Sequence, residues 1–448
     1  MIFLILRNDY LTIFLHNSKK SITFAPKLKH KRQGERKGMD ASNYPHISAL
    51  AAEAAREMSA DELAFQRKRY PDLDDEAWNM LVQQVDGRRR MQRKLPELTS
   101  IQGIIFPPRI NMEQCSSEVT AQYKARLIQA LGVCQLLDLT GGFGIDFLYM
   151  SRGLQKAVYA ERDNNLAAIV RYNLRLTGNY AHCDVLCEDA EKFLQQFTFA
   201  PTTNGKRLIY LDPARRSETG GKVVRIEDCQ PDVTALLPTL LAKSDCVLLK
   251  LSPMLDLTAA IRTLGGTWQT HIVAASGEVK EVLLLHDKNQ TAAQITAADP
   301  TQDLLFTFTG EEEAEAQENL CMATIDEGDY LYEPHAALLK AGAFRVLCKR
   351  YGVAKLATNT HIYHSATMGN AFPGRIFRVE QAYANMRELQ GIQANIICRN
   401  YGMSADALKK RLHAKDGGTT YLLGATTMQG TGKGQGAKPA LFVCKRVK

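Results

Sequence analysis

The sequence predicts an α/β protein with a doubly wound sheet, in which mostly parallel strands are covered by helices on both faces. Short apolar runs alternate with helical stretches from residue 135 to about 285, and these runs are continuously apolar. Such runs are typical of parallel strands, because helices bury both faces of the sheet. A glycine-rich turn directly after the first run supports the same fold, since open α/β sheets bind ligands at such turns.

The alternation of the two patterns gives the expected order of elements. The predicted strands are residues 135–139, 157–160, 184–187, 208–211, 246–251, 271–275 and 279–285. The predicted helices between them are residues 143–152, 164–176, 190–197, 231–243 and 255–264.

The segments on either side of this sheet are predicted to form separate units. Residues 39–100 hold two amphipathic helices and make an N-terminal helical element, and residues 321–448 make a compact C-terminal unit. The C-terminal unit is expected to contain a helical run at 334–351, strands at 375–380, 394–398, 421–423 and 440–444, a helix at 404–413 capped by Ser404, and a flexible loop at 424–438. The acidic stretch at 311–318 is expected to be a solvated helix face or loop.

The positive charge of the chain is concentrated at its N-terminus. Nine Lys and Arg and two Asp and Glu give residues 1–38 a charge of +7, so the other residues carry only +1 of the total of +8. Met39 begins a stretch that is typical of a protein start. We therefore expect residues 1–38 to be a disordered or non-native extension that arises from a misassigned start codon, with a targeting arm as the alternative. Neither a secretory signal nor a transmembrane segment is expected.

The cysteines indicate a reducing compartment and no metal site. The ten cysteines are scattered without any C-x-x-C pair, as is typical of cytoplasmic proteins. His182, Cys183 and Cys187 form the one cluster, and zinc sites normally need a second pair of ligands. We therefore expect a cytoplasmic protein without a bound metal.

Residues 136–146 (LLDLTGGFGID) are the most informative stretch of the chain. An apolar strand ends at Asp138, a glycine turn follows, and a helix begins. A dinucleotide fingerprint counted from Gly142 would require a third glycine where Phe147 stands. Asp138 would also repel a phosphate, whereas it suits a cationic amino-acid group. The turn therefore disfavours a pyrophosphate and favours a positively charged ligand.

Acidic residues follow four successive predicted strands, and together they favour S-adenosylmethionine (SAM). These residues are Asp138, Glu161, Asp189 and Asp212, and the carboxyl ends of such strands are where open α/β sheets bind ligands. SAM carries an ammonium group and a sulfonium, which suit Asp138. Glu161 can accept hydrogen bonds from both ribose hydroxyls, and Asp189 can accept one from the adenine amino group. Singly, each has a structural alternative, such as a simple turn or a helix N-terminus.

Several further motifs identify a family resemblance. They are residues 113–118 (EQCSSE) with Ala121 and Lys124, residues 138–146, residues 212–216 (DPARR), residues 250–253 (KLSP) and residues 330–335 (YLYEPH). On these motifs the chain resembles the class I SAM-dependent methyltransferases, and among them the bacterial family with a small ferredoxin-like insert and a C-terminal THUMP-like domain. The resemblance implies a Rossmann-like methyltransferase domain at 101–277, a ferredoxin-like unit at 278–320 and a THUMP-like domain at 321–448.

The resemblance also implies roles for particular residues. Asp138, Gly141 and Gly144 would line the methionine end of SAM, with Thr140, Gly142 and Phe143 of the same turn as further cofactor contacts, while Glu161 would bind the ribose and Asp189 the adenine. Asp212 and Pro213 match the start of the D/N-P-P-Y/F motif of amino methyltransferases. Ala214 and Arg215 depart from this motif, so stacking of a flipped base on an aromatic residue is not expected there.

A basic loop follows this motif, and it would suit a phosphate-bearing substrate. It consists of Arg215, Arg216, Lys222 and Arg225, and basic side chains position nucleic acids through their phosphates. An exposed basic loop without function is the alternative. THUMP domains accompany RNA modification in other enzymes, so the resemblance implies tRNA or rRNA as substrate.

The predicted reaction is methyl transfer to a base nitrogen of RNA. Ser252 stands where related uridine methyltransferases have a cysteine nucleophile, which disfavours covalent C5 chemistry. Lys250 with Asp212 is similar to the Lys/Asp pairs of ribose 2′-O-methyltransferases, although a lysine at a strand end is more often structural. Two alternatives stay open: a non-catalytic RNA-binding protein that retains SAM as a structural or regulatory ligand, and a methyltransferase of a protein or small molecule. The near-neutral charge beyond residue 38 favours the latter.

Overall fold

The computed structural model describes residues 2–7, 10–15, 22–23, 43–178, 180–215, 225–429 and 436–448. The chain forms two compact units, Met1–Asp40 and Ala41–Lys448. In the first unit, the expected extension, the described residues form the antiparallel strands β1 (Ile2–Arg7), β2 (Tyr10–Leu15) and β3 (Ile22–Thr23).

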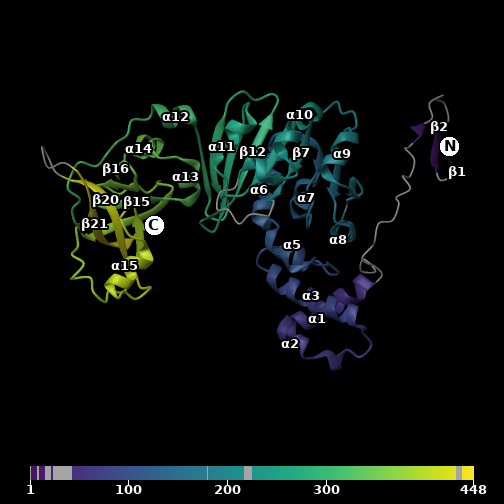
Figure 1. The fold of residues 1–448 in the computed structure, drawn as a ribbon, viewed down its shortest axis with the longest axis horizontal. Coiled ribbons are helices and arrows are strands. Elements are labelled where there is room, and N and C mark those ends of the chain that lie inside the picture. The colour runs from purple at the N-terminus through teal and green to yellow at the C-terminus, as the bar shows by residue number, and fades with distance from the viewer. Residues whose placement is uncertain are drawn as a thin grey trace. The chain divides into compact units, whose positions relative to one another are not determined.

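A nine-stranded mixed sheet dominates the second unit, in the order β14-β13-β11-β12-β10-β7-β4-β5-β6 (Figure 1). Its strands are β4 (Val133–Asp138), β5 (Lys156–Glu161), β6 (Cys183–Cys187), β7 (Lys206–Leu211), β10 (Cys246–Leu251), β11 (Gln269–Ala275), β12 (Glu278–Asp287), β13 (Gln294–Asp299) and β14 (Leu304–Thr309). The first five of these strands are mutually parallel. The α/β fold and every predicted strand are therefore confirmed.

Helices connect the parallel strands, as the alternating pattern predicts. They are α7 (Ile145–Met150), α8 (Asn164–Leu176), α9 (Ala190–Gln196), α10 (Val233–Lys243) and α11 (Leu257–Leu264). Asp163, Asp189, Asp232 and Asp256 cap the last four, each accepting a hydrogen bond from a backbone N–H of the first turn. Because these capping residues follow strands, they fix the residue at which the next helix begins.

Beyond β10 the sheet turns antiparallel, and this changes the expected role of residues 278–320. β11 and β12 form a hairpin through Ser276 and Gly277, which both have positive φ, the conformation that two-residue hairpins favour. β12 inserts antiparallel beside β10, and β13 and β14 extend the sheet beyond β11. Residues 278–309 therefore complete the main sheet and do not form the separate unit that was expected there.

The N-terminal element is helical, as predicted. It consists of α1 (Tyr44–Glu57), α2 (Ala60–Ala64), the 3-10 turn η2 (Arg67–Arg69), α3 (Asp75–Met91), α4 (Pro96–Ser100) and α5 (Arg109–Gln114). α6 (Glu118–Ala130) then packs against α7, β4 and β11. α6 thus leads from the N-terminal helices directly onto the main sheet.

The C-terminal residues form a seven-stranded sheet in the order β16-β17-β15-β18-β21-β20-β19. Its strands are β15 (Tyr330–Pro334), β16 (Ala354–Ala357), β17 (Thr360–Ser365), β18 (Gly374–Gln381), β19 (Asn395–Arg399), β20 (Thr420–Gln429) and β21 (Gly436–Arg446). The helices are α13 (Ala336–Ala341), α14 (Arg345–Tyr351) and α15 (Ala405–Leu412), which Ser404 caps as expected. The predicted loop at 424–438 is wrong, because β20 and β21 pair from Thr420–Lys445 to Gln429–Gly436. Residues 430–435 lie outside the described residues.

The acidic stretch forms a helix with Glu311 and Glu315 exposed, as expected, and its Glu313 has a structural role in addition. α12 (Gly310–Glu315) places Glu313 at the start of α14. Its carboxylate accepts hydrogen bonds from the backbone N–H groups of Phe344, Arg345 and Val346, at 3.1, 2.8 and 3.0 Å. These groups belong to the first turn of a helix and have no partner within it. Glu313 therefore caps α14 from a distant part of the chain.

Glu313→Ala should lower the free energy of unfolding by about 1–2 kcal/mol, the usual effect of losing a helix cap. Urea denaturation measures this difference. Glu315→Ala, which removes an exposed carboxylate from the same helix, serves as the control and should change stability by less than about 0.5 kcal/mol. Equal effects of both substitutions would show that general charge, and not capping, explains the loss.

Candidate functional site

The glycine turn lies between the carboxyl ends of β4, β5 and β7. Asp138, at the end of β4, is 1% exposed, and its carboxylate accepts a hydrogen bond from the Thr140 N–H at 2.9 Å. The Thr140 hydroxyl in turn accepts a hydrogen bond from the Asp212 N–H at 2.6 Å. The structure thus connects the predicted cofactor turn directly to the predicted catalytic residue.

The other end of the turn is held by β5. The Gly142 N–H donates to Glu161 Oε2 at 2.9 Å, the Asp163 N–H donates to Glu161 Oε1 at 2.9 Å, and the Tyr159 hydroxyl donates to the Gly142 carbonyl at 2.6 Å. Each oxygen of a carboxylate can accept more than one hydrogen bond. Glu161 can therefore support the turn and still accept a hydrogen bond from a ligand.

Two glycines of the turn are required for different reasons. A Cβ on Gly141 would lie 2.0 Å from Cε2 of the buried Tyr159 ring. Gly142 has φ +55°, and its nearest neighbour to a Cβ would be 3.8 Å away. Gly141 thus permits the close packing of turn and strand, whereas Gly142 permits the left-handed backbone.

The remaining predicted cofactor residues take separate positions. Phe143 is 6% exposed and packs near Phe106, with ring centroids 6.3 Å apart, so its side chain faces the protein interior. Gly144 has φ +74° and is the N-cap of α7. Asp189 is the N-cap of α9 and accepts from the Lys192 N–H at 3.1 Å. Asp189 thus has the capping role that was the structural alternative for it. Its carboxylate can still accept further hydrogen bonds.

Asp212 and the predicted substrate loop follow β7. The Asp212 side chain is 37% exposed, and Pro213 after it is half-buried. Ala214–Arg215 form the short strand β8, which pairs with β9 (Cys229–Gln230). Arg225 is exposed, whereas Arg216 and Lys222 lie outside the described residues.

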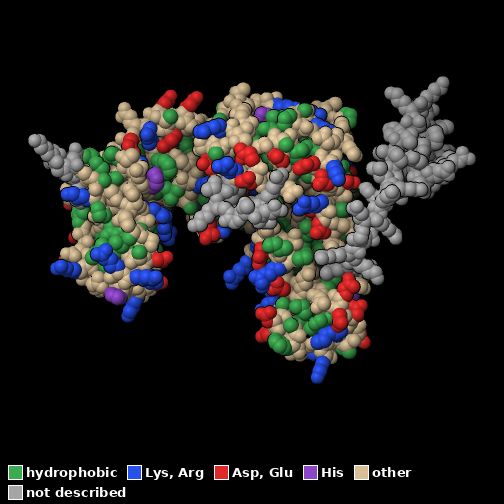
Figure 2. All heavy atoms as spheres, in the orientation of Figure 1, with side chains coloured by type: hydrophobic (Ala, Val, Ile, Leu, Met, Phe, Trp, Pro, Cys, Tyr) green, Lys and Arg blue, Asp and Glu red, His purple; other side chains and the backbone are tan. Residues whose placement is uncertain are grey.

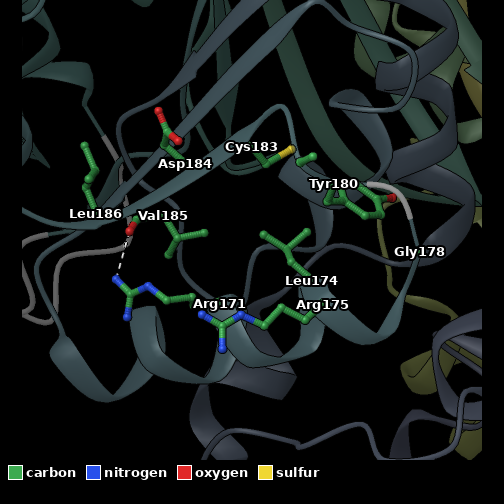
Figure 3. Close-up of a pocket in the computed structure, with 10 residues that line it drawn as sticks. Arg171, Leu174, Arg175, Gly178, Tyr180, Cys183, Asp184, Val185 and Leu186 are labelled. Carbon is green, nitrogen blue, oxygen red and sulfur yellow. Dashed lines mark hydrogen bonds between the residues drawn. The ribbon is translucent and has the colours of Figure 1, made fainter. Parts of the chain in front are cut away.

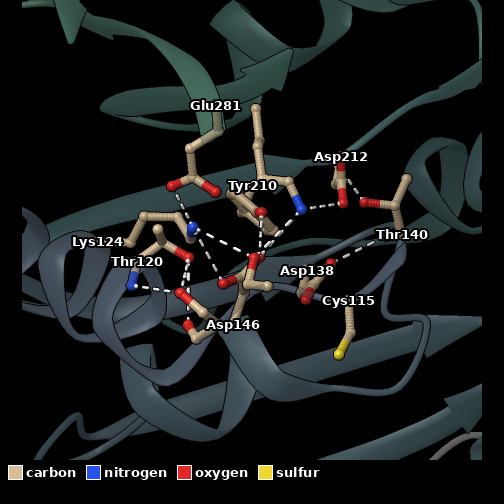
Figure 4. A network of polar contacts seen from close by, with 12 residues as sticks. Cys115, Thr120, Lys124, Asp138, Thr140, Asp146, Tyr210, Asp212 and Glu281 are labelled. Atoms are coloured by element: carbon tan, nitrogen blue, oxygen red, sulfur yellow. Dashed lines mark hydrogen bonds and ion pairs between the residues drawn. The ribbon is translucent and has the colours of Figure 1, made fainter. Parts of the chain in front are cut away.

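A charged network lies beneath Asp212, and the sequence did not reveal it as a unit (Figure 4). The Lys250 ammonium is 2.5 Å from Asp212 Oδ2 and 3.6 Å from Asp146 Oδ2. Asp146 also lies 3.1 Å from the Lys124 ammonium, which pairs with Glu281. Ser116 and Tyr210 donate hydroxyl hydrogen bonds to Asp146 Oδ2, at 2.8 and 2.7 Å.

Burial and neighbouring charges set the ionisation of this network. Burial alone would raise the pKa of Asp146, but Lys124, Lys250 and two hydroxyl donors lower that pKa to about 2. Burial would lower the pKa of Lys250, but Asp212, Asp146 and Glu281 raise it above its ordinary value. Burial and the nearby Asp146, Asp212 and Glu161 raise the pKa of Asp138 well above its ordinary value. Asp146 is therefore an anion and Lys250 a cation at neutral pH.

The sequence held partial signals of this network. Lys124 and Ser116 belong to the motifs of the resemblance, and Asp146 and Lys250 lie in the glycine turn and the KLSP motif. Glu281 carries a weaker signal, since it is a lone carboxylate before the apolar run of β12. Because Lys124 and Glu281 are 157 residues apart, no local pattern could pair them.

A separate groove of about 580 Å³ lies beside the edge strand β6 (Figure 3). Arg171 and Arg175 of α8 line it, and Arg171 donates a hydrogen bond to the Val185 carbonyl at 2.8 Å. Its lining includes none of the predicted cofactor or substrate residues. The carboxyl edge of β4, β5 and β7 therefore remains the candidate site.

Comparison with known proteins identifies the family. The crystal structure of a putative methyltransferase from Porphyromonas gingivalis W83 matches 92% of this chain and 100% of its own, with 32% sequence identity and a TM-score of 0.78. This chain belongs to the same methyltransferase family. Residues 330–373 match a ferredoxin-like domain and residues 374–446 a THUMP-like domain. The ferredoxin-like region thus lies later than the expected 278–320, and the THUMP-like region is shorter than the expected 321–448.

More distant structures match smaller shares of the chain. A Bacillus cereus O-methyltransferase in complex with SAH matches 40% of this chain and 88% of its own, at 17% identity and a TM-score of 0.30. A T. thermophilus 16S rRNA N2 G1207 methyltransferase in complex with AdoMet and guanosine matches 41% of this chain and 44% of its own, at 18% identity and a TM-score of 0.29. No curated protein sequence matches the chain.

The described residues contain neither a membrane-spanning helix nor a cluster of metal ligands. None of the described helices is long and apolar enough to cross a membrane. Within the same residues, no group of three or more His, Cys, Asp and Glu side chains could hold a metal ion. His182, from the cysteine cluster, instead forms a hydrogen bond between Nε2 and the Ser151 carbonyl at 2.9 Å.

Gly141→Ala should destabilise the protein more than Gly142→Ala, because only the first introduces a side-chain clash. We expect a loss of about 3 kcal/mol or more for Gly141→Ala, from overpacking against Tyr159. For Gly142→Ala we expect about 1–2 kcal/mol, from the left-handed backbone alone. Chemical denaturation of both variants tests the order, and a larger loss for Gly142→Ala would contradict the described packing of the turn.

Proposed function

We propose that this protein transfers a methyl group from SAM to a base nitrogen of RNA, with tRNA or rRNA as the substrate class. The observation that carries the proposal is the hydrogen bond between the Thr140 hydroxyl and the Asp212 N–H at 2.6 Å. It holds the glycine turn and Asp212, the residue that would bind the target nitrogen, next to each other at one edge of the sheet. Cofactor and target atom would therefore meet there.

The residues of this edge have the chemistry that SAM needs. Asp138 and the backbone of Thr140–Gly144 would hold the methionine end, Glu161 the ribose and Asp189 the adenine. The carboxyls of Asp138, Glu161 and Asp189 are hydrogen-bond acceptors, and SAM presents an ammonium, two ribose hydroxyls and an amino group to them. The bound cofactor supplies a methyl group on a positively charged sulfur.

Asp212 and Pro213 would form the acceptor side of the reaction. Asp212 lies beside the Lys250 ammonium, which stays protonated because the surrounding carboxylates raise its pKa. Lys250 therefore cannot remove a proton from the substrate. An ionised carboxylate only accepts hydrogen bonds, so Asp212 suits a target nitrogen that carries an N–H. Holding this nitrogen in line with the methyl group supplies most of the rate.

The charge of the THUMP-like region supports RNA as substrate. Residues 374–448 contain thirteen Lys and Arg and four Asp and Glu, a net charge of +9, so residues 39–373 carry −8. The near-neutral sum that argued against RNA therefore conceals two segregated charges. Figure 2 shows blue Lys and Arg side chains over the C-terminal strands and α15. The exposed ones are Arg378, Arg387, Arg399, Lys410, Arg411, Lys415, Lys438, Lys445, Arg446 and Lys448. Such a basic surface is the electrostatic requirement for binding phosphates.

A cytoplasmic location belongs to the same proposal. Nine cysteines, including the buried Cys134, Cys246, Cys321, Cys348 and Cys444, are free thiols. Free thiols persist in a reducing compartment. RNA substrates occur in that compartment as well, so location and substrate are mutually consistent.

Asp212→Asn should lower methyl transfer to RNA by about a hundredfold, because the neutral amide stabilises the target nitrogen less well as positive charge develops on it. The assay follows label from methyl-labelled SAM into total RNA, and calorimetry with S-adenosylhomocysteine checks that cofactor affinity changes only a few-fold. Asp303→Asn, at an exposed turn, is the control and should keep full activity.

The same assay separates the alternatives. Cofactor binding by the wild-type protein without any transfer would indicate the non-catalytic RNA-binding protein. Label that persists in the acceptor fraction after complete ribonuclease treatment would indicate a protein or small-molecule substrate. Full activity of Asp212→Asn would remove Asp212 from the reaction.

Lys410→Ala/Arg411→Ala should weaken RNA binding without changing cofactor affinity. These exposed residues end α15 in the basic THUMP-like region. The slope of log K against log salt should fall by about 1 for each lost phosphate contact. Lys68→Ala/Arg69→Ala, an exposed pair in η2, is the matched control. Equal weakening by both double substitutions would contradict a specific role of the C-terminal surface.

A further inference from the structure

Lys250 has contacts on two sides, which sets it apart from an ordinary lysine at a strand end. Its side chain is 12% exposed. On the outer side the ammonium lies 2.5 Å from Asp212 Oδ2. On the inner side it donates to the hydroxyl of the buried Ser116 at 3.2 Å and lies 3.6 Å from Asp146 Oδ2. Lys250 thus connects Asp212, at the exposed edge of the sheet, to the buried network around Asp146.

The inner partners of Lys250 are themselves fixed. Asp146 is 8% exposed and begins α7 directly after the glycine turn. Lys124, which is fully buried on α6, holds Asp146 at 3.1 Å and pairs with the buried Glu281 of β12. Asp146 therefore receives charges or hydrogen bonds from α6, β7, β10 and the turn before α6. The ammonium of Lys250 has little freedom to follow Asp212 if Asp212 moves.

We propose that Lys250 is a positioning residue for methyl transfer, which holds the Asp212 carboxylate in one orientation beside the glycine turn. This inference rests on the proposed function of Asp212. Lys250 fixes the carboxylate by its Oδ2 atom, and the Thr140 hydroxyl fixes the backbone of the same residue. With Oδ2 engaged, the substrate N–H would be accepted by Oδ1. Lys250 does not contact the reacting atoms in this arrangement.

A second Lys–Asp pair on the same sheet provides a matched control. Lys206, at the start of β7, lies 2.6 Å from Asp287, at the end of β12. This pair occupies the amino-terminal edge of the parallel strands, opposite the candidate site. It has the same chemistry and similar geometry as Lys250–Asp212, but it has no connection to the glycine turn.

The pH dependence of the reaction gives a readout that a purely structural lysine would not change. The ionisable groups facing Lys250 are Asp212 after β7, Asp146 on α7, Glu281 on β12, Lys124 on α6 and Cys115 before α6. The surrounding carboxylates raise the pKa of Lys250, so its replacement by Met removes a positive charge beside Asp212 over the whole pH range measured. The pH profile of methyl transfer should therefore change in Lys250→Met, whereas a lysine that only supports the fold would leave the profile as it is.

The experiment compares Lys250→Met, Lys250→Arg, Asp212→Asn and Lys250→Met/Asp212→Asn in the full chain, with Lys206→Met as control. Single-turnover transfer from labelled SAM to RNA is measured from pH 5 to 9, beside S-adenosylhomocysteine affinity and thermal unfolding. We expect Lys250→Met to slow transfer by about a hundredfold, the effect of a misplaced reacting group, with cofactor affinity within a few-fold. Lys250→Arg should restore part of the rate. Lys206→Met should keep the wild-type rate and pH profile.

The double variant guards against a simple folding defect. Lys250→Met alone leaves a carboxylate without its cation, whereas the double variant removes both charges and should recover stability. The double variant should transfer methyl groups no more slowly than the slower single variant, because both substitutions remove the same interaction. Wild-type rate and pH profile in Lys250→Met would overturn the proposal, as would independent, multiplicative losses in the double variant. A wild-type protein that transfers no methyl group would refute the proposed function itself, and the positioning role with it.

Discussion

The ion pair between Lys124 and Glu281, with Asp146 beside it, is the interaction on which the centre of this structure depends. Lys124 is fully buried, and an isolated ammonium in that position would be strongly unfavourable. The two carboxylates compensate it, and they come from β12 and from the first turn of α7. This requirement ties together the helix that leads onto the sheet, the antiparallel insertion and the glycine turn. Removing one member of such a group typically costs about 3–5 kcal/mol, since the partner is left buried and uncompensated.

The buried charges that stabilise the fold also lie next to the candidate site. Asp146 takes part in the buried pair, yet it also faces Lys250, which reaches the exposed Asp212. The glycine turn is held from three directions by hydrogen bonds to Asp138, Glu161 and Asp212. The candidate site therefore has little need to reorganise when cofactor and substrate bind. Such preorganisation is the main source of electrostatic catalysis in enzymes.

Much of this could be predicted from the sequence, for reasons that also show the limits. The main-sheet strands β4, β5, β6, β7, β10, β11 and β12 were predictable, because a sheet covered on both faces leaves apolar runs in the sequence. The strands β20 and β21 were missed at 424–438, because a stretch rich in Gly, Thr and Lys has the composition of a loop, although Ala425 and Thr427 are buried in the hairpin. Asp138, Glu161, Asp189 and Asp212 could each be recognised in the sequence as an acidic residue after an apolar run. Their position at the carboxyl edge of the sheet followed from the order of the strands. The contact of Lys124 with Glu281 could not be predicted from the sequence, because it depends on β12 lying between β10 and β11.

The apolar core does not stop at the boundary between the main sheet and the C-terminal region. Ile272, Val282 and Phe306 of the nine-stranded sheet belong to the same buried cluster as Leu338, Val346 and Phe372 of the C-terminal residues. α13 packs on β11, β12 and β13, and Lys340 donates to the Leu255 carbonyl at 3.0 Å. Cutting the chain after β14 would expose this face to water. The ferredoxin-like region is thus not an exchangeable module, and evolution could not have gained or lost it without rebuilding the flank of the main sheet.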